Sequence, residues 1–221
     1  MTLYRTALIT SGLSLALFCG SAQAQPVAQG GKPMMTLQMP ATPDPARVTL
    51  DPKTTALIVL DYVEDICIKQ PSCKGQMLPA MIPFLERVRT AGLVVAYGTR
   101  ERNMNHWLKE VAPTASDIKI FNTAQDRFYN TDLDKILKAK GIKTLIMVGW
   151  KISGSVTYTS VGAMVRDYTV VIPVDTTSAG SGYETTIGFY NVLNSGNANL
   201  ANEPLKPKAV TLTRTDMISF Q

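Results

Sequence analysis

The fold is decided by residues 141–179, which read GIKTLIMVGWKISGSVTYTSVGAMVRDYTVVIPVDTTSA. An apolar run at 144–148 ends in Gly149, and a short turn then leads into a helical pattern that begins at Ser155. A second apolar run follows at 169–174. This order of strand, turn, helix and strand is typical of a crossover between parallel strands. Because open α/β sheets place their chemistry where strands end and helices begin, Ser155 is a candidate functional residue.

The same alternation continues through most of the chain. The segment ALIVLD (56–61) is a continuous apolar run, as expected for a strand that is buried on both faces. Gly92 and Gly141 are suited to end two helices, and Thr131 to begin the second of them. We expect strands at 56–61, 93–100, 117–121, 143–149, 169–174 and 209–214, and helices at 77–92, 131–141, 155–167 and within 183–194. This pattern predicts a doubly wound, Rossmann-like α/β domain with a parallel sheet of about six strands.

The N-terminal part of the chain reads as a targeting segment followed by a leader. Arg5 precedes a mostly apolar run at 7–18, and Ala22-Gln23-Ala24 is a small-residue cleavage site. We therefore expect a signal peptide at 1–24, an extended leader at 25–53 and one α/β domain at 54–221. The mature protein would be secreted or periplasmic, with no membrane segment after signal removal.

Composition argues against several classes of partner. The 221 residues carry a formal net charge of +5, but lysines and arginines are scattered without interleaved aromatic residues, so we expect no nucleic-acid partner. The chain has one histidine, His106, which leaves few ligands for a metal cluster. We expect neither a metal nor a cofactor.

Two cysteines remain once the signal peptide is removed. Cys67 and Cys73 are separated by five residues in CIKQPSC. In an oxidising compartment such a pair favours a disulfide that closes a small loop. A reactive thiol or half of a metal site is the alternative.

Three motifs in this order resemble the isochorismatase-like superfamily, also called the cysteine hydrolases, which includes nicotinamidases. They are TALIVLDYVED near the start of the domain, FYNTDLDKIL at the start of the predicted helix 131–141, and the strand–turn–helix–strand stretch quoted above. The resemblance covers roughly residues 54–180. It implies a hydrolase that acts on a small molecule and assembles as a homo-oligomer.

Amidases of that superfamily use an aspartate, a lysine and a cysteine. Asp61 matches the aspartate, which would serve as a base; otherwise its carboxylate caps a helix or closes a turn. Ser155 aligns with the nucleophilic cysteine and would lie among helix N-terminal N–H groups, although serine is equally suited to be a plain N-cap.

The lysine position of the superfamily aligns with Asn122. Lys119 lies about one strand pleat away, and a shift of the alignment would restore it. Arg127 or Lys151 could instead place a cation in the pocket, although such residues are commonly solvated surface charges. Trp150 and Lys151 occupy the turn where relatives place a cis peptide, and Trp150 either floors an aromatic substrate or belongs to the core.

These residues leave three functional hypotheses. The first is an exported hydrolase of a small amide or ester that acts through Ser155. The second is a hydrolase without a covalent step, because isochorismatases proper protonate a vinyl ether through the aspartate alone. The third is a catalytically silent protein that binds a small molecule in the same pocket.

Overall fold

The structure is a computed structural model that describes residue 36 and residues 38–104 and 106–221. The predicted signal peptide at 1–24 lies outside the described residues, as do 25–35 and 37 of the predicted leader. Residues 41–221 form a compact unit that contains all the elements named below. Within the described part of the chain, no helix combines the length and the apolar character that crossing a bilayer requires.

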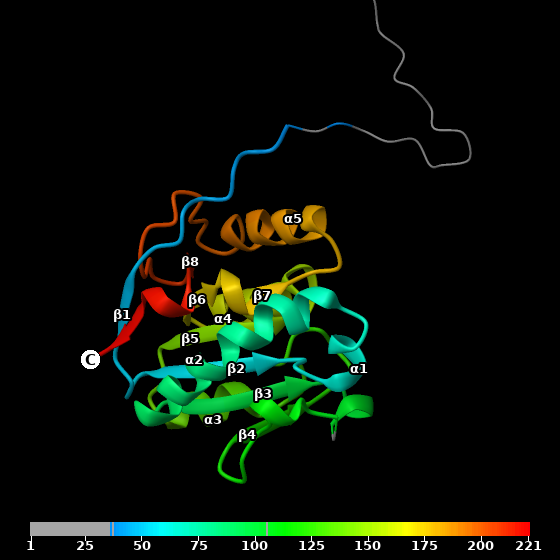
Figure 1. Ribbon diagram of the computed structural model, residues 1–221. Coiled ribbons are helices and arrows are strands. Elements are labelled where there is room, and N and C mark those ends of the chain that lie inside the picture. The colour runs from blue at the N-terminus through cyan, green and yellow to red at the C-terminus, as the bar shows by residue number, and fades with distance from the viewer. Residues whose placement is uncertain (1–35, 37, 105) are drawn as a thin grey trace, which may run out of the picture. The chain divides into compact units, whose positions relative to one another are not determined.

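The centre of the domain is a seven-stranded sheet, whose strands lie one above another in Figure 1 from β4 at the bottom to β8 near the top. Its main path has the order β4-β3-β2-β5-β6-β8, and β7 pairs with β5. All of these pairings are parallel. The strands are β2 (Thr55–Leu60), β3 (Val94–Thr99), β4 (Ile118–Phe121), β5 (Thr144–Trp150), β6 (Thr169–Pro173), β7 (Thr177–Ser178) and β8 (Val210–Thr213). The six predicted strands and the doubly wound fold are confirmed, and the two-residue β7 is added.

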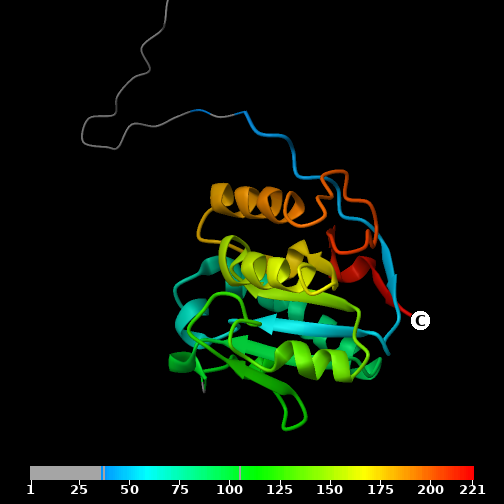
Figure 2. The same cartoon turned by 180° about the vertical axis from the view of Figure 1, so that it is seen from behind.

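Helices cover both faces of this sheet. Alternate residues of β2 point to opposite faces, as the pleat requires. Ala56, Ile58 and Leu60 pack with buried residues of α3 (Leu133–Ala139), α4 (Thr157–Met164) and α5 (Gly182–Leu193), whereas Leu57 and Val59 pack with those of α2 (Leu78–Thr90). Figures 1 and 2 show α2 on one side of the sheet and α3 and α4 on the other. The continuous apolar run of β2 is therefore explained by burial on both faces.

A second, two-stranded sheet joins both ends of the domain. β1 (Val48–Leu50) pairs in parallel with β9 (Ile218–Phe220). Val48 and Leu50 are buried in the core cluster on the α2 side of the main sheet. Both residues belong to the segment predicted as a leader, so its last part is a strand that packs on the domain. A strand of three residues is too short to show the alternation of apolar and polar residues from which a strand is predicted.

Local helix boundaries differ from the sequence-based expectation at two places. The N-cap of α3 is Asp132 rather than Thr131, whose hydroxyl donates to the Arg127 carbonyl oxygen at 2.6 Å. Helix α4 begins at Thr157, because Ile152–Val156 form a π-helical turn (η4) that precedes it. The other short elements are α1 (Glu64–Cys67), η1 (Cys73–Met77), η2 (Glu101–Asn103), η3 (Lys109–Val111), η5 (Val174–Thr176) and η6 (Thr215–Met217).

Gly149 is required by the close approach of β5 to β2. It has φ +132° and pairs in register with Leu60, the last residue of β2. A Cβ on Gly149 would lie 1.9 Å from the Leu60 carbonyl oxygen. No side chain fits there, and the φ angle is one that L-residues rarely adopt. Gly149 therefore allows the close spacing of β2 and β5 at their carboxyl ends, next to Asp61.

We expect Gly149→Ala to lower the free energy of unfolding by about 3 kcal/mol or more, because the methyl group meets backbone atoms that cannot move independently. Gly75→Ala is the matched control, since a Cβ there would have no heavy atom within 4 Å. Urea denaturation of both variants measures the difference. Equal midpoints for the two variants would show that the contact at Gly149 is unimportant.

Cys67 and Cys73 form a disulfide, with their Cα atoms 5.1 Å apart. The bond joins the last residue of α1 to the first residue of η1. It therefore closes the segment that follows the C-terminal end of β2. Small loops of this kind gain about 2–3 kcal/mol from a disulfide in the chain-entropy account.

We expect reduction of this disulfide to loosen residues 64–73 without unfolding the sheet. Hydrogen exchange followed by mass spectrometry should show faster exchange in that segment and unchanged protection of β2. Parallel loss of protection in both segments would refute this expectation. Two free thiols in protein purified from the exported fraction would show that the bond does not form at all.

Candidate active site

Asp61 lies at the carboxyl end of β2, between the ends of β3 and β5. Its backbone adopts φ +55° and its N–H donates to the Gly98 carbonyl oxygen of β3 at 3.0 Å. The residue is 4% exposed. A non-glycine residue in this region of backbone space is uncommon, and the turn directs the carboxylate across the end of the sheet.

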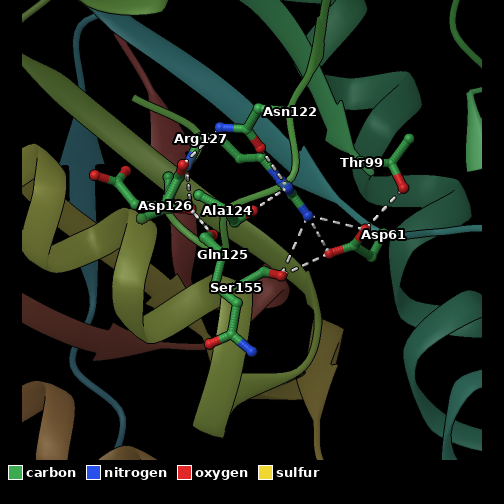
Figure 3. A network of polar contacts seen from close by, with 9 residues as sticks. Asp61, Thr99, Asn122, Ala124, Gln125, Asp126, Arg127 and Ser155 are labelled. Carbon is green, nitrogen blue, oxygen red and sulfur yellow. Dashed lines mark hydrogen bonds and ion pairs between the residues drawn. The ribbon is translucent and has the colours of Figure 1, made fainter. Parts of the chain in front are cut away.

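The Asp61 carboxylate accepts hydrogen bonds from three side chains, as Figure 3 shows. Thr99 Oγ1 donates to Oδ1 at 2.8 Å and Ser155 Oγ donates to Oδ2 at 2.7 Å. Arg127 Nη2 donates to both oxygens, at 3.1 Å and 2.9 Å. The carboxylate thus caps no helix, and it forms the centre of a buried polar network.

Arg127 supplies the positive charge of this network. The residue is 0% exposed, so the expectation of a solvated surface charge is wrong for it. Its Nη2 also lies 3.3 Å from Ser155 Oγ, while Nη1 donates to Asn122 Oδ1 and to the Ala124 carbonyl oxygen, both at 2.7 Å. The side chain passes over Gly98, where a Cβ would lie 2.9 Å from Arg127 Cγ. Gly98 makes the room that a buried arginine needs.

Asn122 lies behind the guanidinium, and its side chain forms no hydrogen bond with Asp61 or Ser155. Its amide nitrogen donates to the carbonyl oxygens of Asp126 and Tyr129, at 2.8 Å and 3.0 Å. Both ends of the side chain are therefore used to orient Arg127 and the loop that carries it. The sequence alignment placed Asn122 at the cation position, but the cation itself comes from Arg127. Lys119 is exposed on β4 and does not line the cavity described below.

Ser155 is held in the π-helical turn before α4, and it is buried. Its hydroxyl donates to Asp61 and accepts from Arg127, so it serves as no helix cap. The N–H groups of Gly154 and Val156 both donate to the Lys151 carbonyl oxygen, at 2.9 Å and 3.3 Å. The expected cluster of free N–H groups around Ser155 is thus partly occupied. The Trp150–Lys151 peptide is cis, as the resemblance predicted.

A cavity of about 260 Å³ opens at this network. Trp150 and Lys151 both line it, together with Ser155 and Asp61. The complete lining is Asp61, Ile66, Arg100, Asn103, Gln125, Trp150, Lys151, Gly154 and Ser155. Ile66 precedes the disulfide-bonded Cys67, so the covalent loop lies directly against the cavity.

Lys151 is paired rather than free. Its ammonium group forms an ion pair with Glu184, the third residue of α5, and Ser153 Oγ donates to the same carboxylate oxygen at 2.6 Å. These hydrogen bonds, led by that from Lys151, lower the pKa of Glu184 to about 2. Glu184 is therefore a carboxylate at neutral pH, and it neutralises the lysine at the wall of the cavity.

Five lining residues and one network residue were not identified from the sequence. Thr99 and Arg100 are the last two residues of the predicted strand 93–100. The expectation that functional residues lie at strand ends, which identified Asp61, would therefore also have identified them. Ile66 lies in the four-residue helix α1, Asn103 in η2, Gly154 in η4 and Gln125 in a loop. These segments are too short to show a periodicity, and no sequence signal marks them. Among the described residues, no group of three or more His, Cys, Asp and Glu side chains could hold a metal ion.

The arrangement can transfer a proton and stabilise an oxygen anion. The Ser155 hydroxyl points at the Asp61 carboxylate at a distance suited to proton transfer. The guanidinium touches both oxygens between which the proton moves. Such a hydroxyl, base and cation are the components of an activated oxygen nucleophile.

The chain is similar to several proteins of known family. The chain is 26% identical over 161 residues to the ureidoacrylate amidohydrolase RutB of Caulobacter segnis, an alignment that covers 51% of this chain and 66% of that protein, just under two thirds of its length. It is 23% identical to a "Probable inactive nicotinamidase" of Arabidopsis thaliana, over 65% of this chain and 90% of that one.

The fold is shared with the crystal structure of N-carbamoylsarcosine amidase from Thermoplasma acidophilum. The TM-score is 0.59 and the identity 22%, over 74% of this chain and 97% of the other. The model of the isochorismatase domain matches residues 55–201, which contain Asp61, Arg127 and Ser155. The chain therefore belongs to the isochorismatase family of hydrolases.

Proposed function

We propose that this protein is a hydrolase of a small amide or ester, with Ser155 as the nucleophile. The observation that carries the proposal is the position of the Ser155 hydroxyl, 2.7 Å from the Asp61 carboxylate, 3.3 Å from the Arg127 guanidinium and on the wall of the cavity. A serine hydroxyl needs an adjacent base to attack a carbonyl group, and Asp61 lies where that base is required.

The reaction takes place in two steps. Ser155 Oγ attacks the carbonyl carbon of the substrate while its proton passes to Asp61, which then protonates the leaving amine or alcohol. Water next attacks the acyl-serine ester and gives a proton to Asp61. Asp61 passes this proton to Ser155 Oγ as the ester C–O bond breaks, and the acid product leaves, so that the serine hydroxyl and the Asp61 carboxylate are both restored. Arg127 offsets the negative charge that is shared between Asp61 and Ser155 before and after each transfer. Bonds and protons balance without any further reactant.

The relatives support amide chemistry. RutB is named an amidohydrolase and the Thermoplasma structure an amidase. The export of this chain remains part of the proposal, and it is supported by the signal-like residues 1–24 and by the Cys67–Cys73 disulfide, since disulfides persist in oxidising compartments. We also propose a homo-oligomer, because the hydrophobic side chains of Tyr158, in α4, and of Val165, directly after it, are exposed and could be covered by a second copy of the chain.

We expect Ser155→Ala to lower turnover by on the order of 10³-fold or more, because the covalent step disappears. Ser160→Ala is the matched control: Ser160 is also buried, its hydroxyl has no partner among the described residues, and it lies one turn along α4. Release of amine or alcohol from a panel of small amides and esters is the measurement. In the wild type, a fluorophosphonate probe should label the peptide that contains Ser155.

Two other outcomes would select a different function. Turnover that survives Ser155→Ala but not Asp61→Asn would indicate a hydrolase without a covalent step, as for a vinyl-ether substrate. Absence of both labelling and turnover, with ligand binding retained, would indicate a silent binding protein. One observation favours the silent binding protein: the Asp61 carboxylate accepts four hydrogen bonds from the protein, as a structural carboxylate does.

Ser155→Cys tests the electrostatics of the site directly. The guanidinium of Arg127 lies beside the position of the new sulfur and Asp61 lies within reach of its proton, so the thiol should react with iodoacetamide faster than an ordinary thiol. Adding Arg127→Gln should slow the reaction, whereas adding Arg166→Gln, which removes a charge elsewhere, should leave it unchanged. Alkylation at the ordinary rate in all three proteins would show that the site does not activate its nucleophile.

A further inference from the structure

Part of the cavity wall comes from the residues that follow β3. Arg100 follows the last residue of this strand, and the η2 turn then folds the chain back, with the Asn103 N–H donating to the Arg100 carbonyl oxygen at 2.8 Å. Both residues line the same cavity as Ser155. None of the chemistry described so far uses either of them.

Neither side chain is satisfied by the described part of the protein. Arg100 has no carboxylate within 4.0 Å among the described residues, and Asn103, 7% exposed, makes no side-chain hydrogen bond to any of them. Among the described residues, only Arg127 Nε and Ser160 Oγ are fully buried side-chain polar atoms without a partner, so the Asn103 amide is open to the cavity rather than sealed in the core. Asn103 is therefore a polar group that a ligand could satisfy.

The other charges around the cavity are neutralised within the protein. Asp61 is paired with Arg127, and Lys151 with Glu184. Among the described residues that line the cavity, only Arg100 carries a charge that is not paired, so the cavity has a positive end at Arg100 and a neutral reactive end at Ser155. An anionic substrate would be attracted to the first end and would not be repelled by Asp61 at the second.

We propose that Arg100 and Asn103 bind the carboxylate of a short substrate acid whose amide or ester group lies at Ser155. This inference rests on the proposed function, because it assigns the substrate class of the same cavity. The guanidinium fork matches the two oxygens of a planar carboxylate, and the Asn103 amide supplies a further donor. Trp150 and Ile66 provide apolar walls for the short carbon chain between the two ends.

The size of the cavity limits the length of that chain. At about 260 Å³ the cavity is smaller than the roughly 300–1,000 Å³ typical of pockets for drug-sized ligands. A cavity of this size favours a small ligand with a short chain between its two functional groups. Half-amides of short dicarboxylic acids, such as malonamate, succinamate and glutaramate, are compounds of this size.

The test measures binding rather than turnover. Calorimetric titration of the Ser155→Ala protein with the three half-amides and with the neutral diamide succinamide separates substrate recognition from catalysis. We expect at least one half-amide to bind about tenfold or more tightly than succinamide, because a hydrogen-bonded charge pair is worth this much. Arg100→Gln should remove the preference, and Asn103→Asp should abolish binding of the acid.

Arg47→Gln is the matched control, because Arg47 is an exposed arginine that does not line the cavity. It should keep the preference for the acid. Saturable binding of none of the acids, equal binding of the acids and succinamide, or a preference that survives Arg100→Gln would each overturn the proposal. Inorganic phosphate that competes as well as the best acid would also overturn it, since the site would then not distinguish a carboxylate. Binding without any turnover in the wild type would instead count against the proposed function alone.

Discussion

The buried ion pair between Asp61 and Arg127 is the interaction on which the rest of the site depends. Removing two charges from water costs several kcal/mol for each ion, and attraction offsets this cost only when the remaining hydrogen-bonding groups are satisfied. Thr99 and Ser155 satisfy the carboxylate, and Asn122 and the Ala124 carbonyl oxygen satisfy part of the guanidinium. The pair therefore holds together segments that lie 66 residues apart in the chain.

An arginine suits this position for a geometric reason. A guanidinium has several donors in a fixed plane, whereas an ammonium is a point charge on a flexible stem. Arg127 uses that plane to contact Asp61 and Ser155 with one nitrogen, and Asn122 with the other. Each contact restricts the others, so the hydroxyl and carboxylate are held in one geometry. The absence of a side chain at Gly98 leaves the volume that the larger cation occupies.

Neutralisation within the protein also determines the character of the cavity. With Asp61 and Lys151 each paired, the electrostatic difference between its two ends comes from Arg100. One end can then attract a charged substrate while the other keeps a carboxylate available for proton transfer. The short disulfide loop next to Ile66 and the strand contact at Gly149 hold the walls on which this division depends.

The sequence by itself determined the six main strands, the helices between them and the positions of Asp61 and Ser155 at strand ends. Those features follow from local apolar runs and from glycines that end helices, which neighbouring residues suffice to reveal. The short β1 and β9 could not be predicted, because three residues carry no clear period and their pairing joins opposite ends of the domain.

Only the tertiary structure decided which residue supplies the cation and whether Ser155 caps a helix. Arg127 lies in a loop without periodicity, and nothing in its neighbours distinguishes a buried arginine from a solvated one. Its burial results from Gly98 on one strand, Asp61 on the next and Asn122 in its own loop, which come together only when the sheet forms. Local sequence records the propensity of each segment, whereas the pairing of charges depends on distances across the fold.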